Sequence, residues 1–405
     1  MAMTARRVGL TVATLMLAFT PLFAVAKTAS LLDLWKGHAH FRQVGTIEWT
    51  DAPGQHSEIG TWYAVRGKAW YAFSRAYLNT PNPTCPGDNT RVVVRESKNH
   101  GKTWSKPTSI VDPGASPAGD GCAILDGSSF YDLPTRTWHM LAQCMALSNA
   151  GGWSLCHYSR ANESPTGRFT ADPANPVVRG GQLWSRICAG ENKACPVSTH
   201  DEGTPYIIEK RNGKFIVTFH GVGPGDKTGF RGVAETRDFK IWTTSGGDLP
   251  GDAIFSAKDC SAWLPGCVGT GAVSTISTPD YRFMIGEIMT KSLACQINQS
   301  WNFEIYRTRR NSWPRAGTGK WEKLVGPPII KSSMPDDATP CPVSYAHFVT
   351  DDSGIYLIYE DWAPRRAFLK RRVLRLFQDG PPISEAQNRA HLANKTRVVS
   401  RKRQR

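Results

Sequence analysis

The chain has 405 residues and a formal net charge of +15, but this charge is unevenly placed. The first 26 residues contribute +2 and residues 365–405 contribute +11, which leaves +2 for the body between them. So small a charge on the body argues against a basic groove, and we expect no nucleic-acid partner.

The N-terminal segment is typical of a secretory signal. Arg6 and Arg7 precede an apolar run over residues 8–23, and Ala24-Val25-Ala26 follows at once. A basic start, an apolar stretch and small residues together predict cleavage after residue 26 and a secreted or periplasmic mature protein. An uncleaved anchor is the alternative, but the run is short for a membrane span, and no later segment is apolar enough to provide one.

The composition of the body favours an all-β fold. The chain contains 37 Gly and 27 Pro, together with 14 Trp, 11 Tyr and 16 Phe, and it has few long helical patterns. Gly and Pro separate short strands, and aromatic side chains fill the space between sheets. We assign residues 27–376 to one domain and residues 377–405 to a basic, disordered tail. Binding of this tail to polyanions is the alternative.

An acidic residue opens a strand-like run three times, at 58–62, 126–130 and 202–206. Each run is followed by a turn and then by an aromatic-rich second strand. A repeat of about 70 residues that contains several short strands predicts the blades of a propeller. We predict a five-bladed β-propeller with four-stranded antiparallel blades, and a strand within 31–50 that closes the ring. The blades are expected to begin near Glu58, Ala123, Glu202, Gly271 and Val343.

Ten cysteines in an exported chain favour disulfides. Spacing alone does not fix the pairing, but it suggests local pairs. The suggested pairs are Cys144 with Cys156, Cys188 with Cys195 and Cys260 with Cys267, which leaves Cys85 with Cys122 and Cys295 with Cys341.

Two segments read as turns between strands. Residues 97–104, which include Asn99, Gly101 and Trp104, are close to the Asp box of sialidases, with Asn in place of the usual Asp. The side chain of Asn99 is expected to bond the turn backbone, Gly101 to take a positive φ and Trp104 to pack between sheets. Residues 236–242 look like a related turn. We expect both segments to be structural.

The blade openings resemble the five-bladed propellers of glycoside hydrolase family 43 and its relatives, which include the invertase-type fructosidases. Asp126-Gly127-Ser128-Ser129-Phe130 is similar to the D-P-S-V-F of the second blade, and Glu202-Gly203-Thr204-Pro205 is similar to the E-G-P of the third. Glu58 stands nearest to the catalytic Asp of the first blade. The resemblance implies that Glu202 is the general acid, Glu58 the base and Asp126 the residue that tunes the acid and orients substrate.

The same resemblance places His347, in Ser344-Tyr345-Ala346-His347, at the axial histidine of the fifth blade. It implies that His347 binds substrate or holds an axial calcium ion; the chemistry itself requires no cofactor. A packed strand histidine is the alternative reading of His347.

Three further residues are expected to bind a sugar. They are Trp62, as a stacking face, Asp201, which is also an alternative to Glu202 as the acid, and Glu287, which interrupts an apolar run. Asp120 is the alternative to Asp126.

Because the three leading carboxylates share one position in the repeat, we expect them to converge on the axis. Converging carboxyls can cleave a glycosidic bond, and their separation decides between inversion, at roughly 6.5–9.5 Å, and retention, at about 5–5.5 Å. The sequence therefore predicts a monomeric, secreted glycoside hydrolase with a carbohydrate substrate. A sialidase-like hydrolase and a non-catalytic carbohydrate-binding propeller remain the alternatives.

Overall fold

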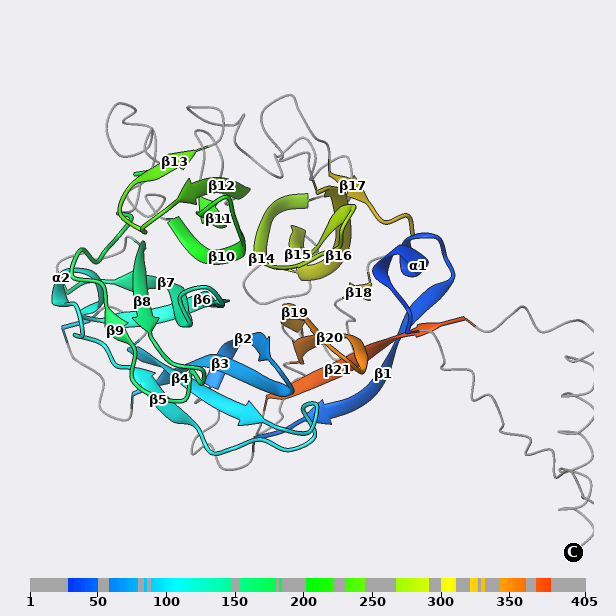
Figure 1. Cartoon of the computed structure of the whole chain (residues 1–405), viewed down its shortest axis with the longest axis horizontal. Coiled ribbons are helices and arrows are strands. Elements are labelled where there is room, and N and C mark those ends of the chain that lie inside the picture. The colour runs from blue at the N-terminus through cyan, green and yellow to red at the C-terminus, as the bar shows by residue number, and fades with distance from the viewer. Residues whose placement is uncertain are drawn as a thin grey trace, which may run out of the picture.

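The computed structural model contains five β-sheets arranged around a common centre (Figure 1). It describes residues 28–49, 58–78, 84–85, 89–147, 153–179, 182–183, 202–221, 230–244, 267–290, 300–310, 321–326, 329–331, 343–361 and 369–379. The predicted signal segment and residues 380–405 of the predicted tail lie outside these ranges, whereas residues 377–379 are described. Within them, no helix has both the length and the apolar character that a membrane crossing requires.

Each of the first three sheets is built from four consecutive antiparallel strands, so sequence order and spatial order agree. The first blade consists of β2 (Glu58–Arg66), β3 (Ala69–Tyr77), β4 (Thr90–Ser97) and β5 (Thr108–Val111). The second consists of β6 (Ala123–Asp132), β7 (Thr137–Met145), β8 (Ser154–Arg160) and β9 (Thr170–Ala171). The third consists of β10 (Glu202–Arg211), β11 (Lys214–Gly221), β12 (Phe230–Thr236) and β13 (Trp242–Thr244).

The fourth blade follows the same order and carries one extra short strand, because β18 also pairs with β16. Its strands are β14 (Cys267–Ser277), β15 (Tyr281–Thr290), β16 (Ser300–Arg309), β17 (Glu322–Lys323) and β18 (Ile330–Lys331).

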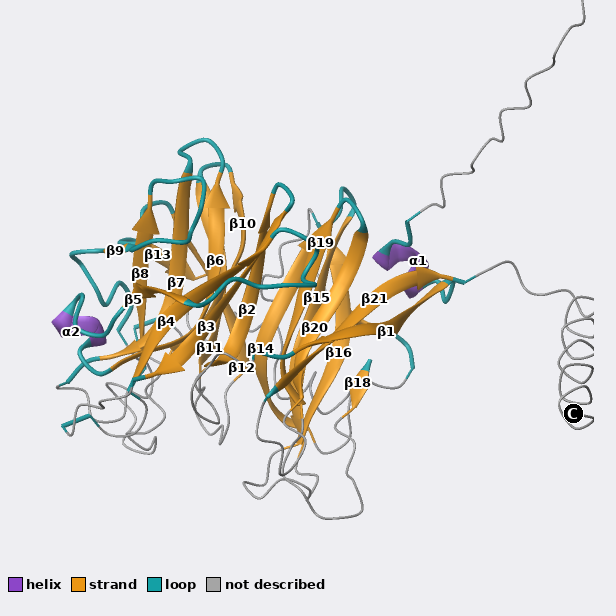
Figure 2. Ribbon diagram, turned by 90° about the horizontal axis from the view of Figure 1, so that it is seen from below, coloured by secondary structure: helices purple, strands orange, loops and turns teal. Residues whose placement is uncertain are grey.

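The fifth blade joins the two ends of the body. Its consecutive strands are β19 (Val343–Asp351), β20 (Gly354–Asp361) and β21 (Lys370–Gln378), and its outer strand is β1 (Ala39–Ile47), which pairs with β21. The N-terminal segment thus supplies the last strand of this blade, whereas its predicted role in closing the ring stays a prediction. Two short helices, α1 (Leu31–Trp35) and α2 (Pro117–Asp120), lie at the outer edge of the ring (Figure 2).

Turn residues explain why the hairpins form where they do. Asn212 and Gly213 join β10 to β11 and both have positive φ, 51° and 75°, as a type I′ turn requires. Gly67 joins β2 to β3 with a φ of 60°. Both predicted structural turns are confirmed. Asn99 Oδ1 accepts from the Thr103 N–H at 2.9 Å, and Asp238 Oδ1 accepts from the Ile241 N–H at 3.0 Å.

The core lies between neighbouring blades. One apolar cluster joins the first blade to the second and includes Trp62, Phe73 and Trp138, while others join the later blades. The innermost strands β2, β6, β10, β14 and β19 surround the centre (Figure 1). Disulfides link Cys85 to Cys122 and Cys144 to Cys156, as predicted. The other three proposed pairs include residues outside the described ranges.

Candidate active site

All five innermost strands lose register with their neighbours at the same place. The breaks fall at 59–62, 124–127, 203–206, 270–273 and 344–347. In each break, two residues of the inner strand lie opposite one residue of the second strand, which makes a β-bulge. Bulges redirect side chains and are common beside active sites. We therefore expect a functional site at this ring of bulges around the propeller axis.

The register corrects one expectation from the sequence. Asp126 is the second residue of its bulge, whereas Glu58 and Glu202 each lie two residues before theirs. The three carboxylates do not share one position in the repeat. Every blade carries the same bulge, so Ala123, two residues before the bulge at 125–126, is the residue equivalent to Glu58 and Glu202, and a sequence pattern does not reveal where a bulge lies.

In three blades, a side chain on the second strand accepts a hydrogen bond from a backbone N–H group in the bulge of the next blade. Gln143 Oε1 accepts from the Thr204 N–H at 2.9 Å. Glu287 Oε1 accepts from the Tyr345 N–H in the same way. Glu360 accepts from the Thr61 N–H at 3.0 Å. Two of these three acceptors are carboxyls, so acidic groups are brought to the bulges from outside the inner strands.

Asp126 lies where three blades meet. Its Oδ2 accepts a hydrogen bond of 2.9 Å from the hydroxyl of Tyr345, in the fifth blade. Its Oδ1 lies 3.4 Å from Nη1 of Arg75, in the first blade. The side chain of Asp126 is 11% exposed and that of Arg75 is 14% exposed, so this pair retains some contact with solvent. A donor and a cation on one carboxylate both stabilise its negative charge.

Glu287 is a buried carboxyl in β15. Oε2 accepts from the Ala272 N–H at 2.8 Å, and Oε1 accepts from the Tyr345 N–H. Burial raises the pKa of Glu287 to about 7, the negative charges of Asp126 and Glu360 add to the rise, and the two N–H donors oppose it. A carboxyl with this pKa is protonated for part of the time at neutral pH, as a general acid must be.

Glu360 is a third carboxyl in the same electrostatic neighbourhood. Its Oε1 accepts 2.8 Å from the Thr61 hydroxyl and lies 3.7 Å from Nη2 of Arg371. Burial raises the pKa of Glu360, whereas the charge of Arg371 lowers it. These contacts hold the first and fifth blades together, so we regard Glu360 as part of the support of the site.

Arg231 is a buried cation close to Glu287. Arg231 is 0% exposed and donates to Thr204 Oγ1 at 2.8 Å and to the Thr204 carbonyl at 2.9 Å. Burial lowers the pKa of Arg231 to about 9, and the charge of Glu287 opposes this shift. Arg231 therefore offsets part of the negative charge near Glu287.

The carboxylate of Glu58 is turned to a partner inside its own blade. Nη2 and Nε of Arg95, in β4, donate to it at 2.7 and 2.9 Å, and both side chains are at most 4% exposed. The Glu58 carbonyl also accepts from Arg371 at 2.8 Å. A buried carboxylate paired in this way is suited to a structural role, and the catalytic role of Glu58 stays a prediction from the sequence.

Glu202 is 0% exposed, and its Oε1 accepts from the Leu183 N–H at 3.2 Å. This contact ties the start of β10 to the segment that precedes it. Its role as the general acid stays a prediction. Asp201 lies outside the described residues. Asp120 is enclosed by donors and accepts from the Tyr158 hydroxyl at 2.7 Å, which fits a structural carboxyl.

Trp62 occupies the core between the first two blades. It is 2% exposed, its ring stacks on Phe73 with centroids 5.8 Å apart, and its Nε1 donates to Ser129. In this position the ring has no open face to offer to a sugar. The expectation of a stacking platform at Trp62 is not met, because the aromatic side chain fills the interface between blades.

His347, in β19, lies between the rings of Tyr63 and Tyr206, with centroids 6.2 and 5.5 Å away, and its Nδ1 accepts from the Tyr63 N–H at 3.5 Å. Burial lowers the pKa of His347 to about 3, so it stays neutral. Calcium takes about six to eight oxygen ligands. Among the described residues, His347 belongs to no group of three or more His, Cys, Asp or Glu side chains that could hold an ion, so we derive no step through an axial calcium, and that ion stays a prediction.

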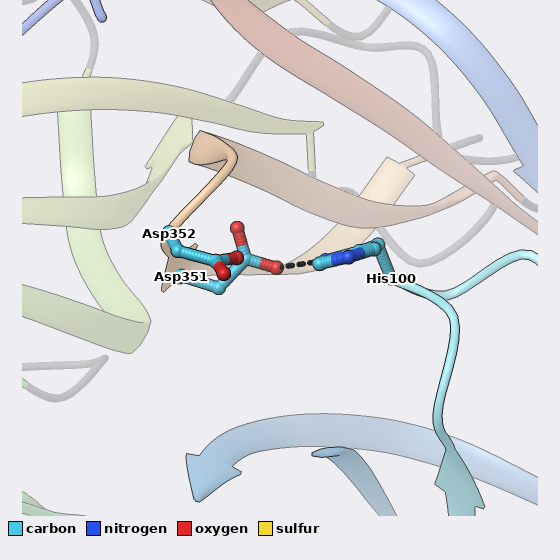
Figure 3. A group of neighbouring side chains, drawn as sticks. All are labelled: His100, Asp351 and Asp352. Atoms are coloured by element: carbon cyan, nitrogen blue, oxygen red, sulfur yellow. Dashed lines mark hydrogen bonds and ion pairs between the residues drawn. The ribbon is translucent and has the colours of Figure 1, made fainter. Parts of the chain in front are cut away.

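Within the described residues, His100, Asp351 and Asp352 form a group that could hold a metal ion (Figure 3). Asp351 Oδ2 already meets His100 Nδ1 at 2.6 Å and accepts from Trp70 Nε1 at 2.7 Å. Its Oδ1 accepts twice from Ser353. Since both oxygens have partners in the protein, the group acts as a tie between the first and fifth blades.

Sequence reasoning missed three participants. Arg75 and Glu360 belong to second strands and read as ordinary polar residues there. Tyr345 enters the sequence pattern only as a neighbour of His347. Its φ of 50° is positive, as are those of Gly60 and Thr204, the first residues of the bulges in the first and third blades, and no local pattern in the sequence gives that angle.

No protein-family model matches the chain, and no curated protein matches it in sequence. Solved structures do match in fold. A structure named as a glycoside hydrolase has a TM-score of 0.57 at 12% identity and covers 86% of this chain and 96% of its own. A thermostable family-43 glycoside hydrolase has a TM-score of 0.53 at 13% identity, with 80% and 93% covered. An α-L-arabinofuranosidase from Podospora anserina in complex with cellotriose has a TM-score of 0.51 at 11% identity, with 84% and 97% covered. At these identities the likeness establishes a shared propeller fold.

Proposed function

We propose that the chain is a secreted or periplasmic glycoside hydrolase, with a carbohydrate bound over the ring of bulges. The observation that carries the proposal is the pair formed by Asp126, which a donor and a cation hold, and Glu287, whose pKa is raised to about 7. Two carboxyls with different environments can act as base and acid in one reaction. Solved structures of similar fold are named as glycoside hydrolases, which supports this reading.

In this proposal Glu287 is the general acid. When protonated it carries one O–H donor, and its two backbone partners, the N–H groups of Ala272 and Tyr345, are themselves donors. The acidic proton is therefore directed to a different acceptor, which here is the oxygen of the leaving group. Transfer of this proton lets the glycosidic bond break without expelling an alkoxide.

Asp126 is the second carboxyl of the reaction. Arg75 and the Tyr345 hydroxyl stabilise its negative charge, so it can take a proton from water or attack the anomeric carbon. The protein itself supplies both functional groups. The proposal needs no cofactor.

Two disulfide bonds support the proposal that the protein is exported. The bonds Cys85–Cys122 and Cys144–Cys156 suit an oxidising compartment. They agree with the signal segment at the N-terminus.

The test is hydrolysis of a panel of aryl glycosides and polysaccharides by the wild type and by Glu287→Gln, Asp126→Asn and Glu202→Gln. Glu287→Gln is expected to lose about 10²–10⁴-fold in turnover, because proton donation is lost while binding is retained. If Glu202→Gln shows this loss of turnover and Glu287→Gln shows none, the general acid is Glu202 and not Glu287.

Glu304→Gln is the matched control. Glu304 is a buried glutamate in the same blade, and it pairs with Lys323 at 3.2 Å instead of contacting a bulge. Its substitution is expected to lower stability and to leave turnover intact. If the wild type binds a sugar without hydrolysing it, and Glu287→Gln binds it equally well, the protein is a carbohydrate-binding propeller and not a hydrolase.

A further inference from the structure

Tyr345 contacts both carboxyls of the proposed pair. Its hydroxyl donates to Asp126 Oδ2 at 2.9 Å, and its backbone N–H donates to Glu287 Oε1. Asp126 belongs to the second blade, Glu287 to the fourth and Tyr345 to the fifth. One residue thus connects two acids that come from blades that are not adjacent.

The backbone of Tyr345 is held in an uncommon conformation. Its φ of 50° lies in the left-handed region, which a bulky side chain rarely adopts, and the residue is the first of its bulge. Gly60 and Thr204, the first residues of the bulges in the first and third blades, also have positive φ, 64° and 34°, so the bulge itself imposes this conformation. Here it accompanies an arrangement in which the N–H and the hydroxyl of one residue serve two different carboxyls.

The hydroxyl of Tyr345 acts as a donor and not as an acceptor toward Asp126. Burial raises the pKa of Tyr345 well above its usual value, Arg75 opposes the rise, and Asp126, Glu287 and Glu360 add to it. The phenol therefore keeps its proton. Arg75 lies 5.9 Å from the ring of Tyr345 and 3.4 Å from Asp126, so both groups favour the carboxylate form of Asp126.

We propose that Tyr345 is a positioning residue that assigns different roles to the two carboxyls. Its hydroxyl holds Asp126 as a carboxylate, and its N–H fixes the orientation of Glu287, which retains the proton. This inference rests on the proposed function for its catalytic meaning. The coupling of the three residues can nevertheless be measured without a substrate.

The experiment is a titration of ¹³C-labelled carboxyl groups, followed by NMR, in the wild type and in Tyr345→Phe. Tyr345→Phe keeps the ring and the backbone N–H and removes the hydroxyl alone. A lost hydrogen bond to a charged group is expected to raise the apparent pKa of Asp126 by about one unit. If a substrate has been found, the acidic limb of its pH–rate profile is expected to move upward by the same amount.

Tyr206→Phe is the matched control. Tyr206 is another tyrosine of an inner strand beside a bulge, but its hydroxyl meets Ser274 Oγ at 3.3 Å. The titration of Asp126 is expected to be unchanged in this variant. A second probe is expected to shift the apparent pKa of Asp126 in the opposite direction. A 3,5-difluorotyrosine at position 345 is a stronger hydrogen-bond donor and is expected to lower this pKa. It also serves if Tyr345→Phe does not fold.

The outcomes separate the two proposals. A shift in Tyr345→Phe or in the fluorinated protein, in proteins that hydrolyse no glycoside, supports the coupling and counts against the hydrolase. Unchanged titration of Asp126 in both would overturn the role of Tyr345, whatever the activity. Equal shifts in Tyr345→Phe and Tyr206→Phe would also overturn it, because they would show a general loosening of the site.

Discussion

Gly60 and Asp126 approach so closely that a Cβ on Gly60 would lie less than 3.0 Å from Asp126 Oδ1. Gly60 also has a φ of 64°. We predict that Gly60→Ala displaces the Asp126 carboxylate and strains the backbone, with a cost of about 1–2 kcal/mol from the left-handed conformation alone. The measurements are urea unfolding and glycoside turnover, and both are expected to fall.

Gly67→Ala is the control that separates the effect of backbone strain from the displacement of the Asp126 carboxylate. Gly67 lies at the end of the same strand pair with a φ of 60°, and nothing would lie within 4 Å of its Cβ. This variant is expected to lose stability and to keep its turnover. Equal effects on turnover in both variants would show that the contact with Asp126 is irrelevant to activity.

Much of the fold could be predicted because the signal for a blade is local. The repeated strand-like runs, the turns and the aromatic-rich second strands placed the starts of β2, β6, β10 and β19 at the predicted residues. The sheet order follows from sequence neighbours in the first four blades. Among the described strands, it is β1, paired with β21, that depends on a contact between distant parts of the chain.

The site was less predictable because its geometry depends on bulges and on contacts between blades. Glu58 looks equivalent to Asp126 until the register shows otherwise, and its partner Arg95 is 37 residues away. Glu287 stands out in the sequence as a charge in an apolar run, but its partners Asp126 and Tyr345 come from other blades. A sequence without alignment carries no signal for such pairs.

The ion pair between Glu58 and Arg95 is expected to be a main support of the first blade. Both side chains are nearly fully buried, so Glu58→Gln leaves the guanidinium of Arg95 uncompensated. Breaking a buried pair costs about 3–5 kcal/mol, and urea unfolding measures the loss. Retained turnover by the folded variant would count against the sequence-based role of Glu58 as base.

The exposed pair between Lys98 and Glu96 is the control for this prediction. Its atoms lie 4.0 Å apart, and the Lys98 side chain is 81% exposed. Such a pair contributes at most about 1 kcal/mol, so Lys98→Gln is expected to leave the unfolding free energy almost unchanged. Comparable losses in the two variants would refute the structural role of the buried pair.

Glu287 makes stability depend on pH. Because the folded pKa of about 7 lies above the ordinary 4.5, the folded state binds the proton more tightly, and this stabilisation is lost as pH rises from 4.5 through 7. The shift corresponds to about 3 kcal/mol. We predict that the difference in unfolding free energy between wild type and Glu287→Gln changes by this amount between pH 4.5 and 8.

The comparison with Glu287→Gln isolates this group, since all other titrations occur in both proteins. Gln143 accepts the equivalent bulge N–H with a neutral amide, so a glutamine in this role is compatible with the fold. A difference that stays constant across the pH range would mean that Glu287 does not carry the shifted pKa.

A pair of buried histidines gives the opposite pH dependence. His157 stacks on Phe239 with centroids 3.9 Å apart, and its Nε2 lies 3.0 Å from Nδ1 of His139. Burial lowers the pKa of each histidine from 6.5 to about 4, and the charge of His157 lowers that of His139 further, while Asp172 opposes the shift of His157. The neutral rings therefore stabilise the fold above pH 6.5, and this stabilisation is lost as pH falls toward 4.

We predict that His139→Phe, which keeps a ring against Phe239, flattens the loss of stability between pH 6.5 and 4. Each shift corresponds to about 3 kcal/mol, so the unfolding free energy of the variant should fall less steeply than that of the wild type. Urea unfolding at several pH values measures this slope, and the solvent-exposed His38, changed to Gln, is the control. Parallel slopes in wild type and His139→Phe would show that the stacked histidines do not govern acid unfolding.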